Sequence, residues 1–286
     1  MPPDGATDAF EAQRPMLLRL GYRMLGSHAE AEDAVQEAWV RWQAADPEGI
    51  AQPAAWLKRV VARICLDHLK SARRRREVYT GPWLPEPLVE EEGDDLRPDN
   101  LTLSLMMALE RLSPLERAAF LLHDVFGQTF EEVAETLGRT PAATRRLAVR
   151  ARAHVRIDQP RYTVPREAGE ELARAFFHAC RTGDASALTG LLSDGATLHS
   201  DGGGKVYNAL NVIRGADKVV RLFLGLSRKR GATMEYLRFT MIDGLPGFIW
   251  RVGDELQTTA LEVEDGRVTT IYVTRNPEKL TRIRLH

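Results

Sequence analysis

The sequence predicts a multidomain chain: two all-α helical domains, the second with a helix-turn-helix, followed by a C-terminal α+β domain. Apolar residues recur at helical spacing up to about residue 76 and again from about 101 to 157. Short β-rich runs divided by turn residues fill the last part, and 286 residues exceed what one core usually organises. We therefore expect domains at 1–76, 101–157 and 166–286, with a linker at 77–100.

Helical spacing predicts a small helical unit for the first domain. Phe10, Leu17 and Leu20 recur near this spacing, and Trp42 continues it farther along the chain. Gly26-Ser27-His28 is typical of a turn, and the acidic residues after it suit the positive N-terminal end of the next helix. A proline-bounded loop then precedes a third helix.

The expected linker is rich in proline and acidic residues. Residues 81–87 are Gly-Pro-Trp-Leu-Pro-Glu-Pro, and acidic residues crowd into Glu90–Asp95. Proline has no backbone N–H and cannot continue a helix, and this composition offers few groups to bury. We expect residues 77–100 to join the two helical domains without forming a core.

The clearest local pattern, Phe130–Leu147, has the spacing of a helix-turn-helix. Small Ala134 allows two helices to approach closely, Gly138 supplies a left-handed turn, and Thr140-Pro141 begins the second helix. Outward arginines of that helix could meet guanine or phosphate in a major groove. The inward residues are Thr144, Leu147, Ala151 and Val155, and the outward ones are Arg145, Arg146, Val149 and Arg152. Taken alone, the pattern also fits an ordinary helical hairpin with a solvated basic face.

A second basic helix is predicted at 56–70, inside the first domain. Its apolar positions are Leu57, Val60, Val61, Ile64 and Leu69. Lys58, Arg59, Arg63 and Lys70 then remain available to DNA phosphates. The basic face of one such helix is often merely exposed to solvent. Two basic helical modules joined by an acidic linker, however, favour nucleic-acid binding.

The last domain begins with a helical pattern and then changes to β-rich runs. Leu172, Phe176, Phe177 and Cys180 mark the helix. The β-rich runs are Phe239–Ile242, Gly247–Val252, Thr258–Val263 and Val268–Val273, separated by Asp243-Gly244, Gly253-Asp254 and Asp265-Gly266. A helix followed by an antiparallel meander predicts an α+β domain.

Composition excludes several classes of protein. The net charge is −1, two distant cysteines suggest no disulfide framework, and no stretch approaches the apolar length of a membrane span. No secretory leader pattern is present, so we expect a cytoplasmic protein that binds no membrane. The titratable residues His199, Asp201, Asp243 and Glu262 have no spacing that fixes a proton shuttle, and we interpret each as a turn or surface group. We expect no enzyme, no cofactor and no metal site.

At this point the sequence resembles a known family. Ala31–Trp39 resembles the polymerase-binding helix in the second conserved region of sigma factors, and Leu109–Arg156 resembles their fourth region. The absence of a third region is typical of the extracytoplasmic-function class. Trp83–Pro87, Asp201–Lys205 and Asn276–Leu280 resemble signatures of the sigma-J type, the subgroup with a SnoaL-like, cone-shaped C-terminal domain.

The resemblance implies a promoter-specific initiation factor whose partners are core RNA polymerase, through its beta-prime clamp and beta flap, and promoter DNA. It assigns polymerase binding to Asp33, Gln36 and Glu37. It assigns the −10 element to Arg59, Arg63, Asp67, Lys70, Arg73 and Arg74, and the −35 element to Arg139, Thr140, Arg145, Arg146, Val149 and Arg150. Thr144 departs from the aliphatic residue usual at this buried position of the family.

The resemblance also implies that the C-terminal domain regulates the sigma domains and replaces a separate anti-sigma factor. The expected interdomain residues are Trp83, Leu84, Pro85, Glu86, Pro87, Asp201, Gly202, Gly203, Gly204, Lys205, Asn276, Pro277, Glu278, Lys279 and Leu280. The glycines lack the strand-loop-helix frame of a phosphate loop and suit either a close-packed contact or a flexible hairpin tip. We expect packing against the linker and the first helical domain.

Two other functions stay open. The chain could be a DNA-binding sensor or enzyme that uses a pocket in the SnoaL-like cone for an unknown small ligand. It could also be a repressor that binds DNA without polymerase.

Overall fold

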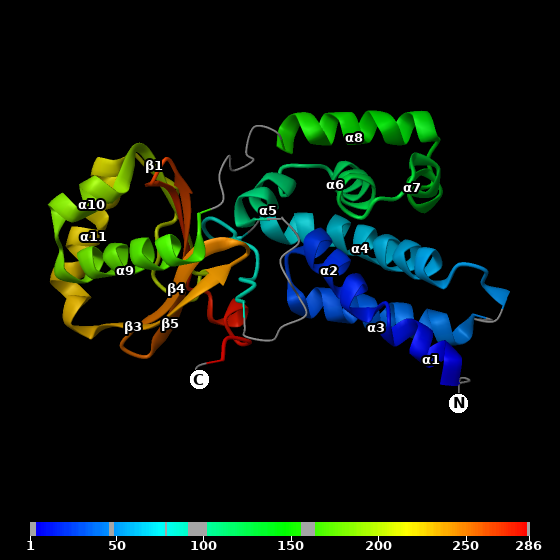
Figure 1. The fold of residues 1–286 in the computed structure, drawn as a ribbon, viewed down its shortest axis with the longest axis horizontal. Coiled ribbons are helices and arrows are strands. Elements are labelled where there is room, and N and C mark those ends of the chain that lie inside the picture. Colours follow the sequence, from blue (N-terminus) through cyan, green and yellow to red (C-terminus); the bar gives the residue numbers. More distant parts are fainter. Residues whose placement is uncertain (1–3, 46–48, 78, 91–101, 156–163, 285–286) are drawn as a thin grey trace. The chain divides into compact units, whose positions relative to one another are not determined.

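The computed structural model describes residues 4–45, 49–77, 79–90, 102–155 and 164–284, with only the backbone described at 71–77 (Figure 1). The chain divides into two compact units, and each is described by itself. Unit 1 comprises Met1–Glu77 and Leu105–Asp158, and unit 2 comprises Val78–Ser104 and Gln159–His286. The expected linker therefore belongs mainly to the C-terminal unit. No helix in the described segments is long and apolar enough to cross a membrane.

The first part of unit 1 is a set of four helices. They are α1 (Asp4–Glu11), α2 (Arg14–Leu25), α3 (His28–Ala44) and α4 (Pro53–Glu77). Leu17, Leu20 and Leu57 are fully buried where the helices meet. Trp42, 1% exposed, donates its indole N–H to the carbonyl of Ala6 at 2.9 Å and so ties α3 to α1.

The expected turn between the first helices is present at Gly26-Ser27. Gly26 ends α2 in the left-handed conformation, with φ of 72°. Ser27 caps α3, because its hydroxyl accepts the backbone N–H of Glu30 at 3.4 Å. Glycine and serine thus fix where one helix ends and the next begins.

The second part of unit 1 carries the predicted helix-turn-helix. Its elements are α5 (Leu103–Leu109), whose first two residues belong to unit 2, α6 (Pro114–Phe120), one π-helical turn (Leu121–Val125), α7 (Phe130–Leu137) and α8 (Pro141–Val155). Capping boxes start α6 at Ser113 and α7 at Thr129. Gly138 closes α7 with φ of 62°, and the Thr140 hydroxyl accepts the N–H of Ala143 at the start of α8.

Unit 2 combines helices with one sheet. The helices are α9 (Arg166–Thr182), α10 (Ala185–Leu191) and α11 (Ala216–Arg230), with short 3-10 turns at Gly231–Thr233 and Pro277–Lys279. The strands are β1 (Leu192–Asp201), β2 (Ile213–Arg214), β3 (Met234–Ile242), β4 (Leu245–Val252), β5 (Glu255–Glu264) and β6 (Arg267–Thr274). The expected α+β class is confirmed.

The sheet differs from the predicted meander in one respect. Its strand order is β2-β1-β6-β5-β4-β3, and β1 runs parallel to β6. Alternation and turn residues identified the antiparallel hairpins from β3 to β6. The partner of β1, however, follows it in sequence only after α11 and four other strands. The expectation of a purely antiparallel sheet is therefore wrong.

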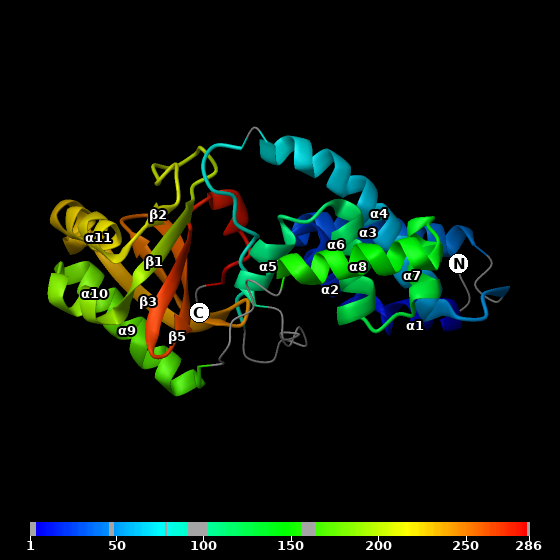
Figure 2. The same ribbon diagram turned by 90° about the horizontal axis from the view of Figure 1, so that it is seen from above.

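One face of the sheet is packed by helices. In Figures 1 and 2, α9, α10 and α11 lie on the same side of the strands. Aromatic rings fill the space between them: Phe176 meets Phe223 edge to face at 5.4 Å, and Phe177 lies 5.9 Å from Trp250. The described residues between the sheet and these helices form a packed apolar core.

The opposite face of the sheet is covered by the segment before it in sequence. Residues 79–90 and the C-terminal 3-10 turn lie on that side in Figures 1 and 2. Val89 forms an antiparallel bridge with Ile242, and Leu84 is fully buried. The expectation that this proline-rich stretch has few groups to bury is wrong, because the sheet supplies the surface that buries them.

Candidate functional site

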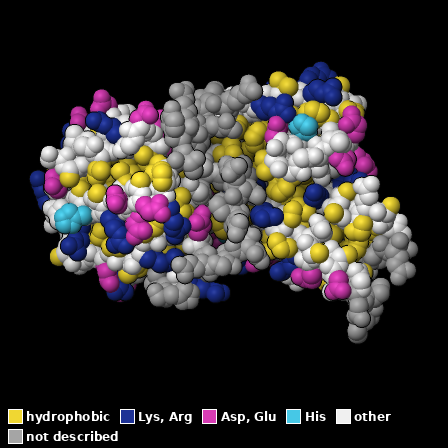
Figure 3. Space-filling model, viewed as in Figure 1, with side chains coloured by type: hydrophobic (Ala, Val, Ile, Leu, Met, Phe, Trp, Pro, Cys, Tyr) yellow, Lys and Arg dark blue, Asp and Glu magenta, His cyan; other side chains and the backbone are white. Residues whose placement is uncertain are grey.

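Helix α8 presents its basic face to solvent. Figure 3 shows Lys and Arg side chains gathered over this helix. Arg145 and Arg146 are exposed, and Val149 is an apolar side chain that remains 55% exposed. Such a surface suits a major groove, in which arginine pairs with guanine and an apolar group meets a thymine methyl.

Several arginines of α8 are held by the scaffold. Arg150 Nε donates to Glu116 of α6, and Arg152 Nε donates to Asp124, each at 2.7 Å. The Arg145 guanidinium lies over the Phe130 ring, 4.9 Å from its centroid. Arg146 has no ion-pair partner within the described ranges.

Thr144 is fully buried, as its position on the inward face of α8 predicts. Its hydroxyl donates to the Thr140 carbonyl at 3.1 Å, so the polar group is hydrogen-bonded within its own helix. Helix α8 therefore keeps the inward and outward faces that the sequence predicts, although Thr144 is polar. The exposed Arg139 and Thr140 lie at the start of the helix.

The basic face of α4 differs from expectation, because two of its arginines are engaged by α7. Arg59 forms an ion pair with Glu135. Arg63 donates Nε to the Thr136 carbonyl at 3.0 Å and Nη2 to the Glu135 carbonyl at 2.7 Å. The prediction that Arg59 and Arg63 remain available is therefore wrong for this arrangement of unit 1.

Other predicted residues of α4 point to solvent. Lys70 pairs with Asp67 at 2.7 Å, and both side chains are more than 70% exposed. The side chains of Arg73 and Arg74 lie outside the described residues.

The predicted polymerase-binding residues share the exposed surface of α3. Asp33, Gln36 and Glu37 are all exposed, and Glu37 pairs with Arg41 at 2.5 Å. Val40, 58% exposed, adds an apolar side chain one turn beyond Gln36. The helix therefore offers an acidic surface with an apolar neighbour.

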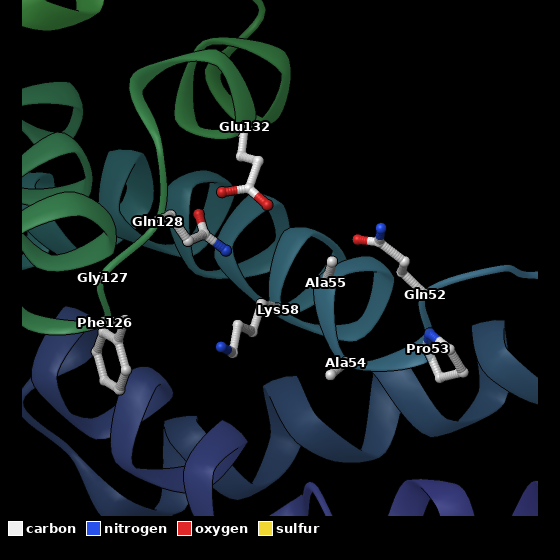
Figure 4. Close-up of a pocket in the computed structure, with 9 residues that line it drawn as sticks. All are labelled: Gln52, Pro53, Ala54, Ala55, Lys58, Phe126, Gly127, Gln128 and Glu132. Carbon is white, nitrogen blue, oxygen red and sulfur yellow. The ribbon is translucent and has the colours of Figure 1, made fainter.

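A pocket of about 380 Å³ lies in unit 1 between the start of α4 and the loop before α7 (Figure 4). Lys58 of α4 and Glu132 of α7 lie on different sides of it. Hydrogen bonds from the Thr129 amide and hydroxyl lower the pKa of Glu132, and the charges of Lys58 and Arg59 lower it further. The contact between these helices is thus partly open and rich in charge.

In unit 2, parts of the three predicted interdomain motifs meet at one buried carboxylate. Asp201, at the end of β1, is 0% exposed. It accepts hydrogen bonds from the Tyr79 hydroxyl at 2.6 Å, the Leu84 N–H at 2.8 Å and the Gly203 N–H at 3.0 Å. Lys279 Nζ forms an ion pair with it at 2.7 Å. We call these residues and Trp83 the Asp201 clasp.

Lys279 binds the linker as well as the sheet. Its ammonium donates to the Leu84 carbonyl and lies over two rings, 4.3 Å from the centroid of Trp83 and 5.1 Å from that of Tyr79. Burial raises the pKa of the Tyr79 phenol, and the hydrogen bond to Asp201 raises it further, so Tyr79 stays a donor.

The glycine loop allows close approach of other segments. Gly203 has φ of 62°, and a Cβ there would lie 2.4 Å from Nδ2 of Asn276. A Cβ on Gly202 would lie 2.7 Å from the Val206 carbonyl oxygen. Lys205 pairs with Glu278 across the same loops. Asn276 Nδ2 in turn donates to the Tyr79 hydroxyl at 3.0 Å.

The remaining predicted motif residues flank this centre. Pro85, Glu86 and Pro87 are buried, Leu280 is 5% exposed, and Pro277 and Gly204 are exposed.

A second anchor holds the linker farther along. Asp243, in the β3–β4 turn, is 1% exposed and accepts the Leu88 N–H at 3.0 Å. Its own N–H donates to the Leu88 carbonyl at 2.8 Å. The interpretation as a turn or surface group is therefore wrong for Asp201, which ends a strand and is buried. Asp243 does lie in a turn, but it is buried rather than at the surface. Tyr79 carried no signal in the sequence. Asp243 was identified only as part of the Asp243-Gly244 turn, where its φ is 45°, and its bond to the linker was missed.

The other two titratable residues named from the sequence, Glu262 and His199, both lie beside Tyr272. The Tyr272 hydroxyl donates to Glu262 at 3.1 Å, and the rings of His199 and Tyr272 lie 5.3 Å apart. No cluster of His, Cys, Asp or Glu suited to a metal ion occurs in the part of the chain that the structure describes.

Comparisons with known proteins place the two helical regions in known families. Residues 9–75 match the Sigma-70 region 2 family and residues 102–155 match the Sigma-70, region 4 family. The chain is 41% identical to "ECF RNA polymerase sigma factor SigJ" of Mycobacterium tuberculosis, covering 95% of this chain and 92% of that protein. It is 33% identical to "Probable ECF RNA polymerase sigma factor SigI" of the same species, over 98% of this chain and 97% of the relative.

The fold agrees as well. The crystal structure of Mycobacterium tuberculosis SigJ superimposes with a TM-score of 0.79 and 37% identity, covering 98% of this chain and all of that one. Two helical regions, a helix-and-sheet domain and full-length similarity all point the same way: the chain belongs to the extracytoplasmic-function family of RNA polymerase sigma factors.

Proposed function

We propose that this sigma factor directs core RNA polymerase to promoters whose −35 element is read by α8 and whose −10 element is read by α4. The exposed Arg146 and Val149 on α8 support base contacts, and the ion-paired Arg150 supports a fixed phosphate contact. Asp33, Gln36 and Glu37 on α3 bind the polymerase clamp. The family supports this initiation role, and the residue assignments are ours.

We further propose that unit 2 regulates the sigma domains by holding the linker between them. The observation that carries this proposal is the Asp201 clasp, where the linker, the glycine loop and the C-terminal turn share one buried charge. A linker fixed at Tyr79, Leu84 and Leu88 has little freedom to follow its two sigma domains. Polymerase then favours the released form by binding it more tightly.

This regulation makes a separate anti-sigma factor unnecessary, and the protein acts in the cytoplasm with polymerase. Unit 2 serves without catalysis or a small ligand. The packed aromatic core of Phe176, Phe177, Phe223 and Trp250 supports this over a ligand sensor, because those rings occupy the interior between sheet and helices.

Run-off transcription with core polymerase tests the proposal. Full-length protein is compared with a chain ending at Pro165, with one lacking Asn276–Leu280, and with Lys279→Met. We expect each change to alter transcript yield, and tail removal to activate more than full deletion because the rest of unit 2 stays to support the open state. Equal yields from all four proteins would contradict a regulatory role for unit 2.

A further inference from the structure

The two halves of unit 1 are joined by a reciprocal pair of arginine contacts. Arg63 of α4 donates to the last carbonyls of α7, those of Glu135 and Thr136. Arg117 of α6 donates Nε and Nη2 to the carbonyl of Arg23, in the last turn of α2, at 3.1 and 3.0 Å. Each half thus supplies a cation to the negative end of a helix in the other half.

The α2 contact is buried, whereas the α7 contact is more accessible. Arg117 is 2% exposed and also pairs with Glu110. The Arg59 and Glu135 side chains are 29% and 58% exposed. The pocket beside Lys58 and Glu132 shows that this second contact is incompletely packed (Figure 4). Charge and hydrogen bonds hold it, and such contacts open at lower cost than a packed apolar interface.

We propose that α7 has a second function: its acidic side and C-terminal carbonyls act as an internal substitute for DNA phosphate on α4. Arg59 and Arg63 bind carboxylate and carbonyl oxygens in the way that they would bind phosphate oxygens. While α7 occupies them, these two arginines of the −10 surface are masked by the −35 module. This inference rests on the −10 role proposed above for Arg59 and Arg63.

The masking has a different physical basis from the Asp201 clasp. It lies wholly in unit 1 and needs neither the linker nor the C-terminal turn. It also weakens with salt, because partly exposed charges are screened. Release of the clasp alone therefore leaves Arg59 and Arg63 bound to α7 until polymerase or DNA competes for them.

Charge reversal in the full-length chain tests the idea. Glu135→Lys places a cation against Arg59, and Glu131→Lys is the matched control, since Glu131 is exposed on the same helix with no ion-pair partner among the described side chains. Both variants add the same charge, so a general gain in DNA affinity cancels. A fluorescent duplex with an unpaired central bubble is the probe. We expect Glu135→Lys to bind it about two- to fivefold more tightly than Glu131→Lys, within the range that one partly exposed ion pair supplies.

A distance measurement separates closure from DNA binding. Spin labels go on cysteines introduced at the exposed positions Gln43 in α3 and Ala153 in α8. Burial raises the pKa of the Cys65 and Cys180 thiols, so labelling favours the introduced sites. We expect a longer, broader distance in Glu135→Lys, an unchanged one in Glu131→Lys, and a return to the original distance in Arg59→Glu combined with Glu135→Lys.

The outcomes are distinguishable. Unchanged distances in Glu135→Lys would overturn the inference that α7 locks α4. Opening without a gain in DNA affinity would leave the lock in place but overturn the −10 role of Arg59 and Arg63, and with it the masking. Opening with the affinity gain and restoration by the charge swap supports both.

Discussion

Removing the ammonium of the Asp201 clasp gives the sharpest prediction about unit 2. Lys279→Met keeps the length of the side chain but leaves the carboxylate of Asp201, 0% exposed, without its cation. Loss of one partner of a buried ion pair costs about 3–5 kcal/mol. Three hydrogen-bond donors, on Tyr79, Leu84 and Gly203, still stabilise the carboxylate. We therefore expect a loss near the lower limit, about 3 kcal/mol.

Urea unfolding and amide hydrogen exchange measure this loss. Because the Leu84 N–H donates to Asp201, its exchange rate reports whether the linker detaches before unit 2 unfolds. Lys205→Met is the matched control: it removes a lysine from the neighbouring loop, where the Lys205 and Glu278 side chains are 47% and 66% exposed. That pair should contribute about 0–1 kcal/mol.

Double substitution makes the prediction stricter. Asp201→Asn combined with Lys279→Met leaves neither charge. The double variant should therefore lose about 1–3 kcal/mol less unfolding free energy than the sum of the losses in the two single variants. If Lys279→Met costs no more than Lys205→Met, or if the double variant is additive, the clasp is not held by a buried charge pair and the reasoning fails.

Three further predictions concern unit 1. Arg146→Ala should weaken −35 binding by about 1–3 kcal/mol and relax base preference at one position in a binding-site selection, whereas an equal loss on all sequences would make Arg146 a phosphate contact. Thr144→Val should change the free energy of unfolding, measured in urea, by less than about 1 kcal/mol, because the hydroxyl it removes bonds only within α8; a larger loss would contradict that account. The pKa of Glu132 is lowered in the folded state, so its stabilising contribution is present above the unfolded-state pKa and is lost as pH falls through the folded-state pKa. Glu132→Gln should therefore make the stability fall less steeply at acidic pH. An unchanged fall would refute the capping role.

Local chemistry allowed much of unit 1 to be predicted from the sequence. Gly26, Ser27, Gly138 and Thr140 mark helix ends through backbone geometry and capping, which depend on a few neighbouring residues. Apolar spacing placed Thr144 and Leu147 on the buried face of α8. Such features need no knowledge of distant segments.

Long-range partners could not be predicted in this way. Arg59 and Arg63 have the same exposed spacing on α4 whether they face solvent or α7, and only the fold brings Glu135 to them. In the sequence Asp201 resembles a surface aspartate, because Tyr79 and Lys279, which bind it in the fold, lie far from it along the chain. The parallel pairing of β1 with β6 was missed for the same reason.

The sequence separation within the Asp201 clasp has a consequence for newly made chains. Leu84 and Lys279 are 195 residues apart, and synthesis at roughly 5–20 residues per second leaves about 10–40 s between them on the ribosome. Within that interval the second sigma region is completed, while the lysine that holds the linker has not yet been added. Each nascent chain therefore passes through a period in which this restraint is absent, and slow translation of the last strands lengthens that period.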